Sequence, residues 1–197
     1  MLFSSGPEDF NGSDPLIINN TIVGNLAGIF VSPGHPTILN NTIENGIYGI
    51  LCMGYSKKFM IVMDIVSNNS CGINSIFYGP AIIKYNLISF NGAGIQFGEK
   101  ASIEYNIVKN NGDGISVSAG GENDSPSLHY NHIFNNTNGI RYGETIGNVT
   151  INATYNYWGS PDGPSGYGNG HGDSADKNII FEPWLTEPVE NAGSRNK

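Results

Sequence analysis

Three residues of reactive types, Lys84, Glu104 and His129, occupy the same place in a repeated pattern, two positions before an asparagine or its equivalent. If consecutive repeats stack as parallel strands, these side chains stand about 4.8 Å apart in one outward row. An acid between two bases suits proton abstraction from a uronic acid. Charge pairing on a solvated face would use the same row and is worth under ~1 kcal/mol per pair.

Arg141 is a fourth candidate for a catalytic role. It is the second residue after Gly139, in a row whose earlier members are uncharged: Phe30, Leu51, Asn74, Gln96 and Ser116. The pair of carboxylates on adjacent outward positions that a glycoside hydrolase needs does not occur in the sequence pattern.

Aromatic residues form a second row, immediately before the asparagine of four consecutive repeats. Its members are Tyr85, Tyr105, Tyr130 and Tyr155. Such a row predicts a stack of rings that stabilises the last coils. The alternative is a platform on which sugar rings stack, with Tyr85, Tyr105 and Tyr130 as binding residues.

Metal ligands are few in this sequence. Asp162, Asp173 and Asp176 lie in a glycine-rich stretch whose oxygens suit Ca²⁺, although Asp also bonds nearby backbone N–H groups in turns. His129 and His132 form an H-x-x-H motif, but on a continuous strand this spacing points the two rings to opposite faces. The sequence implies no cofactor, and Ca²⁺ at these three aspartates is the one candidate.

A repeat of about 22 residues organises these positions. The dipeptide Gly-Ile recurs with spacings of 21, 23, 22, 20 and 25 residues, its glycines being Gly28, Gly49, Gly72, Gly94, Gly114 and Gly139. Eight residues before each glycine stands Asn20, Asn41, Asp64, Asn86, Asn106 or Asn131. Aliphatic residues lie three positions before and two positions after each of these.

A period near 22 without a helical pattern predicts one coil of three short strands per repeat. We therefore expect an all-β fold, a single-stranded right-handed parallel β-helix of about seven coils. The aliphatic rows fill its interior, and the asparagine row forms a corner. At that corner the asparagine can take a left-handed conformation and hydrogen-bond to the coils above and below.

The residues after the last repeat resemble a known terminal block. The motif Asn156-Tyr157-Trp158-Gly159, the later Gly-Pro and Gly-Asp pairs, and Phe181-Glu182-Pro183-Trp184-Leu185 look like the ends of secreted archaeal and bacterial β-helix repeat proteins. These belong to the pectin-lyase-like superfamily and include the periplasmic copper-associated type. The resemblance implies the fold, whereas the superfamily holds lyases, hydrolases, epimerases, adhesins and scaffolds.

The pattern divides the chain into four parts. We expect an N-terminal arm over 1–15, parallel β-helix coils over 16–155, a C-terminal cap with Trp158 and Trp184 as lids over 156–185, and a flexible tail over 186–197. No amphipathic segment precedes the first coil, so stacked β-helix neighbours at the N-terminal end are candidate partners.

Composition limits the classes of binding partner and the cellular location. With a net charge of −8 and nine Lys and Arg residues, the chain lacks the basic patch that nucleic acid requires. No apolar run approaches the ~18 residues of a membrane span, and the first ten residues do not resemble a signal peptide. Eight Asn-x-Ser/Thr sequons favour an extracellular, cell-surface or periplasmic location.

These observations favour a non-catalytic extracellular or cell-surface β-helix module, either a structural rod or a binder of glycans or partners. One alternative is a carbohydrate-active enzyme, a polysaccharide lyase or epimerase that acts on uronic-acid polymers. The other alternative is a periplasmic metal-delivery protein, for which the sequence offers few clustered His and Met residues.

Overall fold

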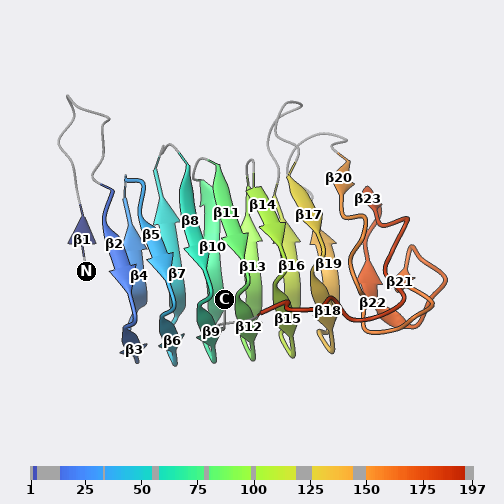
Figure 1. Cartoon of the computed structure of the whole chain (residues 1–197), viewed down its shortest axis with the longest axis horizontal. Coiled ribbons are helices and arrows are strands. Elements are labelled where there is room, and N and C mark those ends of the chain that lie inside the picture. Colours follow the sequence, from blue (N-terminus) through green and yellow to red (C-terminus); the bar gives the residue numbers. More distant parts are fainter. Residues whose placement is uncertain are drawn as a thin grey trace.

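The chain folds as a parallel solenoid of short strands with three faces (Figure 1). The computed structural model describes residues 2–3, 14–32, 34–54, 58–77, 80–98, 101–118, 126–143 and 150–193. Each coil contributes one strand to each of three sheets, which we name A, B and C, and consecutive coils pair in parallel. The strands of one sheet are therefore about one repeat apart in the sequence.

The three sheets have nine, eight and six strands among the described residues. Sheet A contains β1 (Leu2–Phe3), β4 (Ala27–Val31), β7 (Tyr48–Met53), β10 (Cys71–Phe77), β13 (Ala93–Phe97), β16 (Asp113–Val117), β19 (Asn138–Tyr142), β22 (Gly172–Ala175) and β21 (Pro164–Gly166). Sheet B contains β2 (Leu16–Ile18), β5 (Thr37–Leu39), β8 (Phe59–Val62), β11 (Ala81–Lys84), β14 (Ala101–Glu104), β17 (Ser127–His129), β20 (Ile151–Asn152) and β23 (Ile179–Ile180). Sheet C contains β3 (Thr21–Val23), β6 (Thr42–Glu44), β9 (Ile65–Ser67), β12 (Leu87–Ser89), β15 (Ile107–Lys109) and β18 (His132–Phe134).

The number of complete coils is slightly lower than the sequence predicted. Six coils have a strand in every sheet within the described residues, from β2–β4 to β17–β19. A seventh coil starts with β20 but reaches sheet C only through a single bridge between His132 and Tyr157. The repeat ends there because the chain after Trp158 enters the cap instead of forming another full strand.

Isoleucine rows fill the interior, as predicted. Along sheet A, Ile73, Ile95, Ile115 and Ile140 are aligned in register, and each is 0% exposed. Burial of one such side chain stabilises the fold by about 1.5–3 kcal/mol. No single coil could bury its own row, so each coil depends on its neighbours.

Buried amides join the coils at the corner between sheets B and C. Asn86 is 0% exposed, and its backbone N–H and its side-chain Nδ2 both donate to Oδ1 of Asn106 at 3.0 Å. The same Nδ2 donates back to the carbonyl of Ile61, at 3.0 Å. The predicted hydrogen bonding to the coils on both sides is therefore confirmed.

The prediction that the corner asparagine itself adopts the left-handed conformation is wrong. The positive φ belongs to the residue before it, for example 59° at Tyr85 and 56° at Tyr105. That preceding residue makes the sharp turn, and the turn directs the asparagine side chain inward. From this inward position one amide reaches the backbone of the preceding coil and the asparagine side chain of the following coil.

A second amide ladder, which the sequence analysis missed, lies five residues further along each coil. Asn91 Nδ2 donates to Asn111 Oδ1 at 3.1 Å, and Asn111 Nδ2 donates to Asn136 Oδ1 at 2.9 Å. Asp173 in β22 ends this ladder by accepting from Asn136 Nδ2 at 2.7 Å. The two ladders therefore lie at the corners before and after each strand of sheet C.

The glycine of the Gly-Ile repeat is needed because consecutive coils approach closely there. A Cβ on Gly72 would lie 2.6 Å from the carbonyl oxygen of Gly94, and the same clash recurs from coil to coil. Any side chain at this position would push two coils apart.

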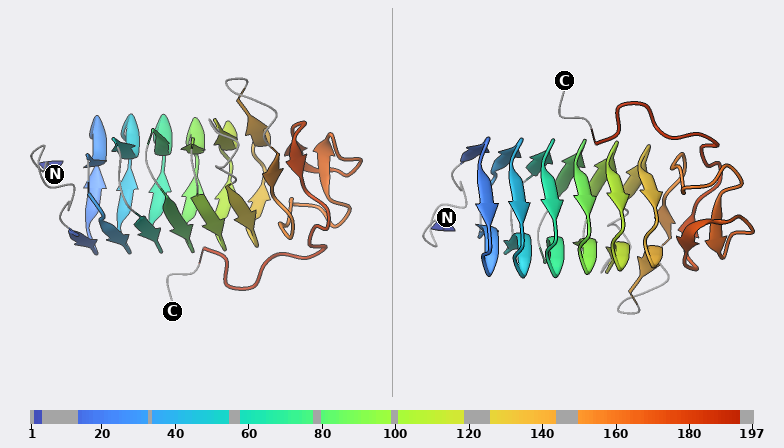
Figure 2. Two further views of the ribbon diagram at one scale, coloured as in Figure 1. Left: turned by 90° about the horizontal axis from the view of Figure 1, so that it is seen from above. Right: turned by 90° about the horizontal axis from the view of Figure 1, so that it is seen from below.

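The last part of the chain closes one end of the solenoid and then turns back. Trp158 is fully buried, Trp184 packs partly buried against the core, and the N–H of Leu185 donates to the carbonyl of Asn156 at 3.0 Å. Residues 186–193 then run back along the outside of the coils (Figures 1 and 2), where the N–H of Gly193 donates to Tyr105 O at 2.8 Å. Gly193 belongs to the segment 186–197 for which the sequence suggested a flexible tail, and the last four residues of that segment lie outside the described residues.

At the other end, β2 and β3 are the edge strands of sheets B and C, whereas β1 pairs with β4 in sheet A. Leu16 and Leu26 near this edge are 62% and 72% exposed. In the described part of the chain, no helix has the length and apolar character that a membrane span requires.

Candidate functional site

The outward row of Lys84, Glu104 and His129 forms as the repeat predicted. Strands β11, β14 and β17 pair in register, so Lys84 is next to Glu104 and Glu104 is next to His129. Lys84 Nζ lies 2.9 Å from Glu104 Oε2, and Ser102 Oγ donates to Glu104 Oε1 at 2.5 Å. Both oxygens of the central carboxylate are thus already bonded within the row.

These bonds determine how readily Glu104 can accept a proton. Burial by itself raises the pKa of Glu104, but the hydrogen bonds from Ser102 and Lys84 and the charges of Lys84 and His129 outweigh it. The pKa of Glu104 therefore lies below its usual value, which makes the carboxylate a weaker proton acceptor. His129 Nδ1 lies 2.8 Å from Thr154 O, which can only accept, so Nδ1 carries a proton in this contact.

A shallow depression of about 370 Å³ lies beside this row on sheet B. It is lined by Lys58, Pro80, Ala81, Ile82, Lys84, Ala101 and Ser102. The two lysines and the serine hydroxyl could bind an anionic group of a ligand. The depression does not include Glu104 or His129 among its lining residues, so binding and proton transfer are not combined in one pocket.

Arg141 lies on a different face from the other catalytic candidates. It belongs to β19 in sheet A, and its guanidinium donates to Asp113 Oδ2 at 2.9 Å. Asp113 also accepts from Asn138 Nδ2 at 2.8 Å. The structure therefore engages Arg141 with its own neighbours and not with the row on sheet B.

The tyrosine row is a continuous stack. Ring centroids are 5.2 Å apart from Tyr85 to Tyr105, 5.3 Å to Tyr130 and 5.8 Å to Tyr155, with interplanar angles between 15° and 19°. Because the rings cover one another's faces, the stack presents mainly ring edges to solvent. A sugar ring stacks on an aromatic face, so this geometry suits stabilisation of the coils better than a sugar platform.

The three aspartates of the cap serve separate local contacts. Asp162 accepts from Ser160 Oγ at 2.6 Å and pairs with the His171 ring, Asp173 ends the second amide ladder, and Asp176 accepts from the N–H of Tyr142 at 3.0 Å. Burial raises the pKa of Asp173, against the hydrogen bonds from Asn136.

Histidine and acidic side chains do not gather into a metal centre within the described ranges. No group of three or more His, Cys, Asp or Glu side chains there has the geometry to hold a metal ion. The expectation that His129 and His132 point to opposite faces of one strand is wrong, because a corner separates them. His129 ends β17 in sheet B and His132 begins β18 in sheet C.

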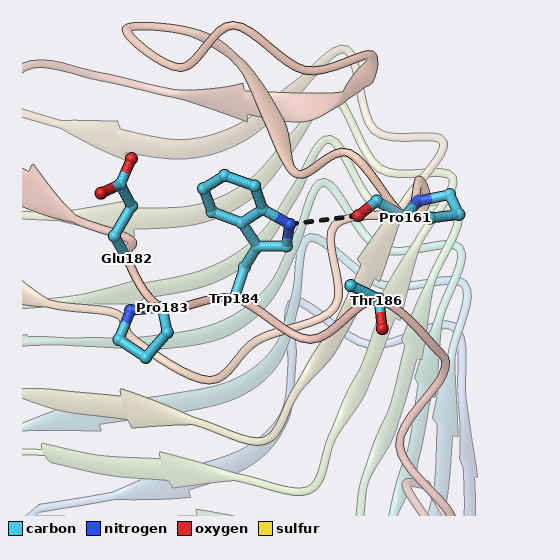
Figure 3. Close-up of a pocket in the computed structure, with 5 residues that line it drawn as sticks. All are labelled: Pro161, Glu182, Pro183, Trp184 and Thr186. Atoms are coloured by element: carbon cyan, nitrogen blue, oxygen red, sulfur yellow. Dashed lines mark hydrogen bonds between the residues drawn. The ribbon is translucent and has the colours of Figure 1, made fainter.

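The cap contains a larger cleft, of about 610 Å³, around the indole of Trp184 (Figure 3). Its lining residues are Pro161, Glu182, Pro183, Trp184 and Thr186. Figure 3 shows the ring face-on, with the carboxylate of Glu182 on one side and Pro161 on the other. An aromatic face, a carboxylate and a hydroxyl are thus exposed together.

Several contacts fix the indole in place. Trp184 Nε1 donates to the carbonyl of Pro161 at 3.2 Å. The ring also lies against Gly163, where a Cβ would come within 2.6–3.0 Å of three indole atoms. Gly163 has φ of +87° and no side chain, which allows this close packing. One face of the indole is therefore covered by backbone, and the other borders the cleft.

Comparison with known proteins agrees with this architecture. A family model described as a right-handed β-helix region matches residues 8–155, about three quarters of the chain. The chain belongs to the right-handed β-helix family. Searches of curated proteins and of solved structures found no match. Its membership in this β-helix family agrees with the resemblance to the pectin-lyase-like superfamily.

The matched region ends before the Trp184 cleft, which the sequence analysis interpreted only as part of a lid. Pro161 and Trp184 are 23 residues apart and belong to no repeat. One signal was available: Trp184 has a carboxylate two residues before it and a hydroxyl two residues after it.

Proposed function

We propose that this protein is a non-catalytic β-helix module that binds glycans through the Trp184 cleft. The observation that carries the proposal is the indole face that borders a cleft of about 610 Å³ beside one carboxylate and one hydroxyl. The module serves as a rigid rod that presents this cleft at its capped end. We propose that the protein meets its glycans outside the cell, at the cell surface or in the periplasm.

The chemistry of the cleft matches that of a sugar ring. A pyranose has an apolar C–H face, which packs on an aromatic ring, and a rim of hydroxyls, which bond to polar groups. Trp184 supplies the face, Glu182 accepts hydrogen bonds and Thr186 can donate or accept. The indole N–H is already used by Pro161, so Trp184 contributes its ring and not a hydrogen bond.

The segment that carries Trp184 is held firmly against the last coil, which also favours binding. Backbone hydrogen bonds join Tyr155 N to Pro183 O at 2.6 Å and Leu185 N to Asn156 O at 3.0 Å, so the Trp184 segment is tied to the last coil on both sides. A ring that is fixed before binding loses little conformational entropy when a ligand arrives.

Replacing Trp184 tests the proposal. In a glycan array followed by titration with a bound oligosaccharide, Trp184→Ala should weaken binding about tenfold, since the stacking surface is lost. Trp184→Phe, which keeps a smaller ring, should bind with intermediate affinity. Tyr167→Ala is the matched control, because Tyr167 is a 68% exposed aromatic of the cap outside the cleft. Equal binding by Trp184→Ala and the parent would refute the proposal.

The second candidate function is a lyase or epimerase of uronic-acid polymers. It is favoured by the in-register row of Lys84, Glu104 and His129 and by the lysines in the adjacent depression. Incubation with polyuronates, with and without Ca²⁺, should then give unsaturated or epimerised product that disappears in Glu104→Gln. If no product forms in either condition, this candidate is excluded and the binding module is left as the function.

A further inference from the structure

From the charges around the Trp184 cleft, we infer that it selects glycans that carry amino groups and discriminates against uronic acids. The inference rests on the proposed glycan-binding function and adds the class of sugar to it. Its basis is the juxtaposition of an aromatic face with the carboxylate of Glu182, in a cap that carries little positive charge (Figure 3).

The described cap and the segment that follows it, residues 156–193, are strongly acidic. One lysine, Lys177, and one histidine, His171, are outnumbered by six carboxylates: Asp162, Asp173, Asp176, Glu182, Glu187 and Glu190. Three of these six line the cleft or adjoin a lining residue in sequence, namely Asp162, Glu182 and Glu187. At physiological ionic strength charges act over about 8 Å, so these groups affect a ligand in the cleft.

Glu182 is the carboxylate best placed to contact that ligand. Asp162 already pairs with His171 and accepts from Ser160, and the hydrogen bond with Asp162, followed by its charge, raises the pKa of the histidine. Glu182 is exposed and, within the described residues, makes no hydrogen bond or ion pair. Its negative charge is thus available to a cation in the cleft.

The aromatic face favours the same charge. A cation placed over the face of an indole is attracted by the electron density of the ring, and tryptophan is the strongest side chain in this respect. The ammonium group of an amino sugar could interact with the ring and with Glu182 together. A uronate in the same place would bring its carboxylate next to Glu182, where like charges repel.

The experiment compares three oligosaccharides of equal length. They are an oligomer of glucosamine, its N-acetylated and hence neutral counterpart, and an oligomer of galacturonate. Titrations follow tryptophan fluorescence at low salt and at a pH where the amine is protonated. Trp158 is fully buried and Trp184 borders the cleft, so a change on binding reports mainly on Trp184.

We expect the amino oligomer to bind about threefold tighter than the neutral one, and the galacturonate oligomer to bind more weakly than both. Glu182→Gln should remove the preference, so that the amino and neutral oligomers bind the variant with equal affinity. Glu190→Gln changes the net charge equally but lies outside the cleft, so it should retain the preference. Added salt should reduce the preference in the parent protein.

Different failures separate the two proposals. If none of the three oligomers binds, the glycan-binding function itself is refuted. If the neutral oligomer binds but the amino oligomer gains nothing, or if Glu182→Gln keeps the preference, only the selectivity is refuted. A lysine-containing peptide that binds as tightly as the amino oligomer would also overturn it, because the cleft would then recognise cations and not amino sugars.

Discussion

Asn106→Asp exchanges a single NH₂ group for oxygen in the centre of the first amide ladder. The side chain of Asn106 is 0% exposed. Its Nδ2 donates to the carbonyl of Ile83 at 2.8 Å and to Asn131 Oδ1 at 3.0 Å. In the variant, a carboxylate oxygen would face these two acceptors. The shape of the residue stays the same, so any effect reports on hydrogen bonding and charge.

The expected loss follows from the bonds that disappear. Two buried hydrogen bonds contribute about 1 kcal/mol each to stability, and the buried carboxylate oxygen that faces two acceptors without a donor adds a penalty of about 1–3 kcal/mol. We therefore expect Asn106→Asp to lower the free energy of unfolding by about 3–5 kcal/mol. That is a large part of the ~5–15 kcal/mol of a typical domain.

Urea unfolding followed by circular dichroism measures this difference, provided that the slope with denaturant is unchanged. Asn25→Asp is the control, because Asn25 is exposed and, among the residues that the structure describes, its side chain donates to Val23 O alone, at 3.0 Å. The opposite exchange, Asp64→Asn, should stabilise the protein by about 1 kcal/mol, since it supplies a donor at an equivalent ladder position. If Asn106→Asp unfolds at the same urea concentration as the parent, the side-chain donors of the ladder contribute nothing and our reasoning is wrong.

Two further predictions concern the coils. Burial, followed by the charge of Lys109, lowers the pKa of His132 from 6.5 to about 4, so below pH 6.5 the unfolded chain binds its proton first. Stability should therefore fall by about 2 kcal/mol between pH 6.5 and 4, and His132→Leu should remove that part of the pH dependence in unfolding titrations; an unchanged dependence would contradict the assignment. Ile95→Asp should bury an unpaired charge in a fully enclosed row and unfold several coils, whereas Gln96→Asp on the outward side should melt close to the parent.

The interior of the solenoid was predictable because stacking forces the same residue type to recur. Ile95 stands between two other isoleucines in register, and a mismatch would leave a cavity in two interfaces at once. The corner asparagines recur for the same reason. The second ladder, with Asn91 and Asn111, was equally periodic and could have been found by extending the comparison five residues beyond the first.

The conformation of the corner was harder to predict. Tyr85 and Tyr105 take a positive φ although their side chains disfavour it, while the asparagines beside them do not. Residue preference alone assigns the turn to asparagine. The actual assignment follows from tertiary packing. An inward Asn106 side chain donates to the carbonyl of Ile83 and accepts from the backbone N–H of Asn86, both in the preceding coil. It also donates to the asparagine side chain in the next coil.

The candidate site was also predictable only in part. The row of Lys84, Glu104 and His129 could be predicted because in-register stacking brings equivalent residues together. The hydrogen bonds from Ser102 and to Thr154 could not be predicted, because these two residues occupy positions that the repeat does not constrain. The Ser102 contact, together with Lys84, leaves the central acid Glu104 satisfied, and the Thr154 contact engages His129.

The Trp184 cleft lies where the periodic argument ends. Inside the coils, stacking determines the inward residue and the corner residue, which leaves short outward rows as the variable surface. In the cap, Pro161 and Trp184 meet through a loop and a returning segment, so a concave site can form without disturbing a ladder. The last coil supplies the rigidity through Asn156 and Tyr155, whose backbone groups hold the Trp184 segment on both sides. A solenoid of this kind therefore favours a binding site at its end, where a fixed edge and an unconstrained loop are combined.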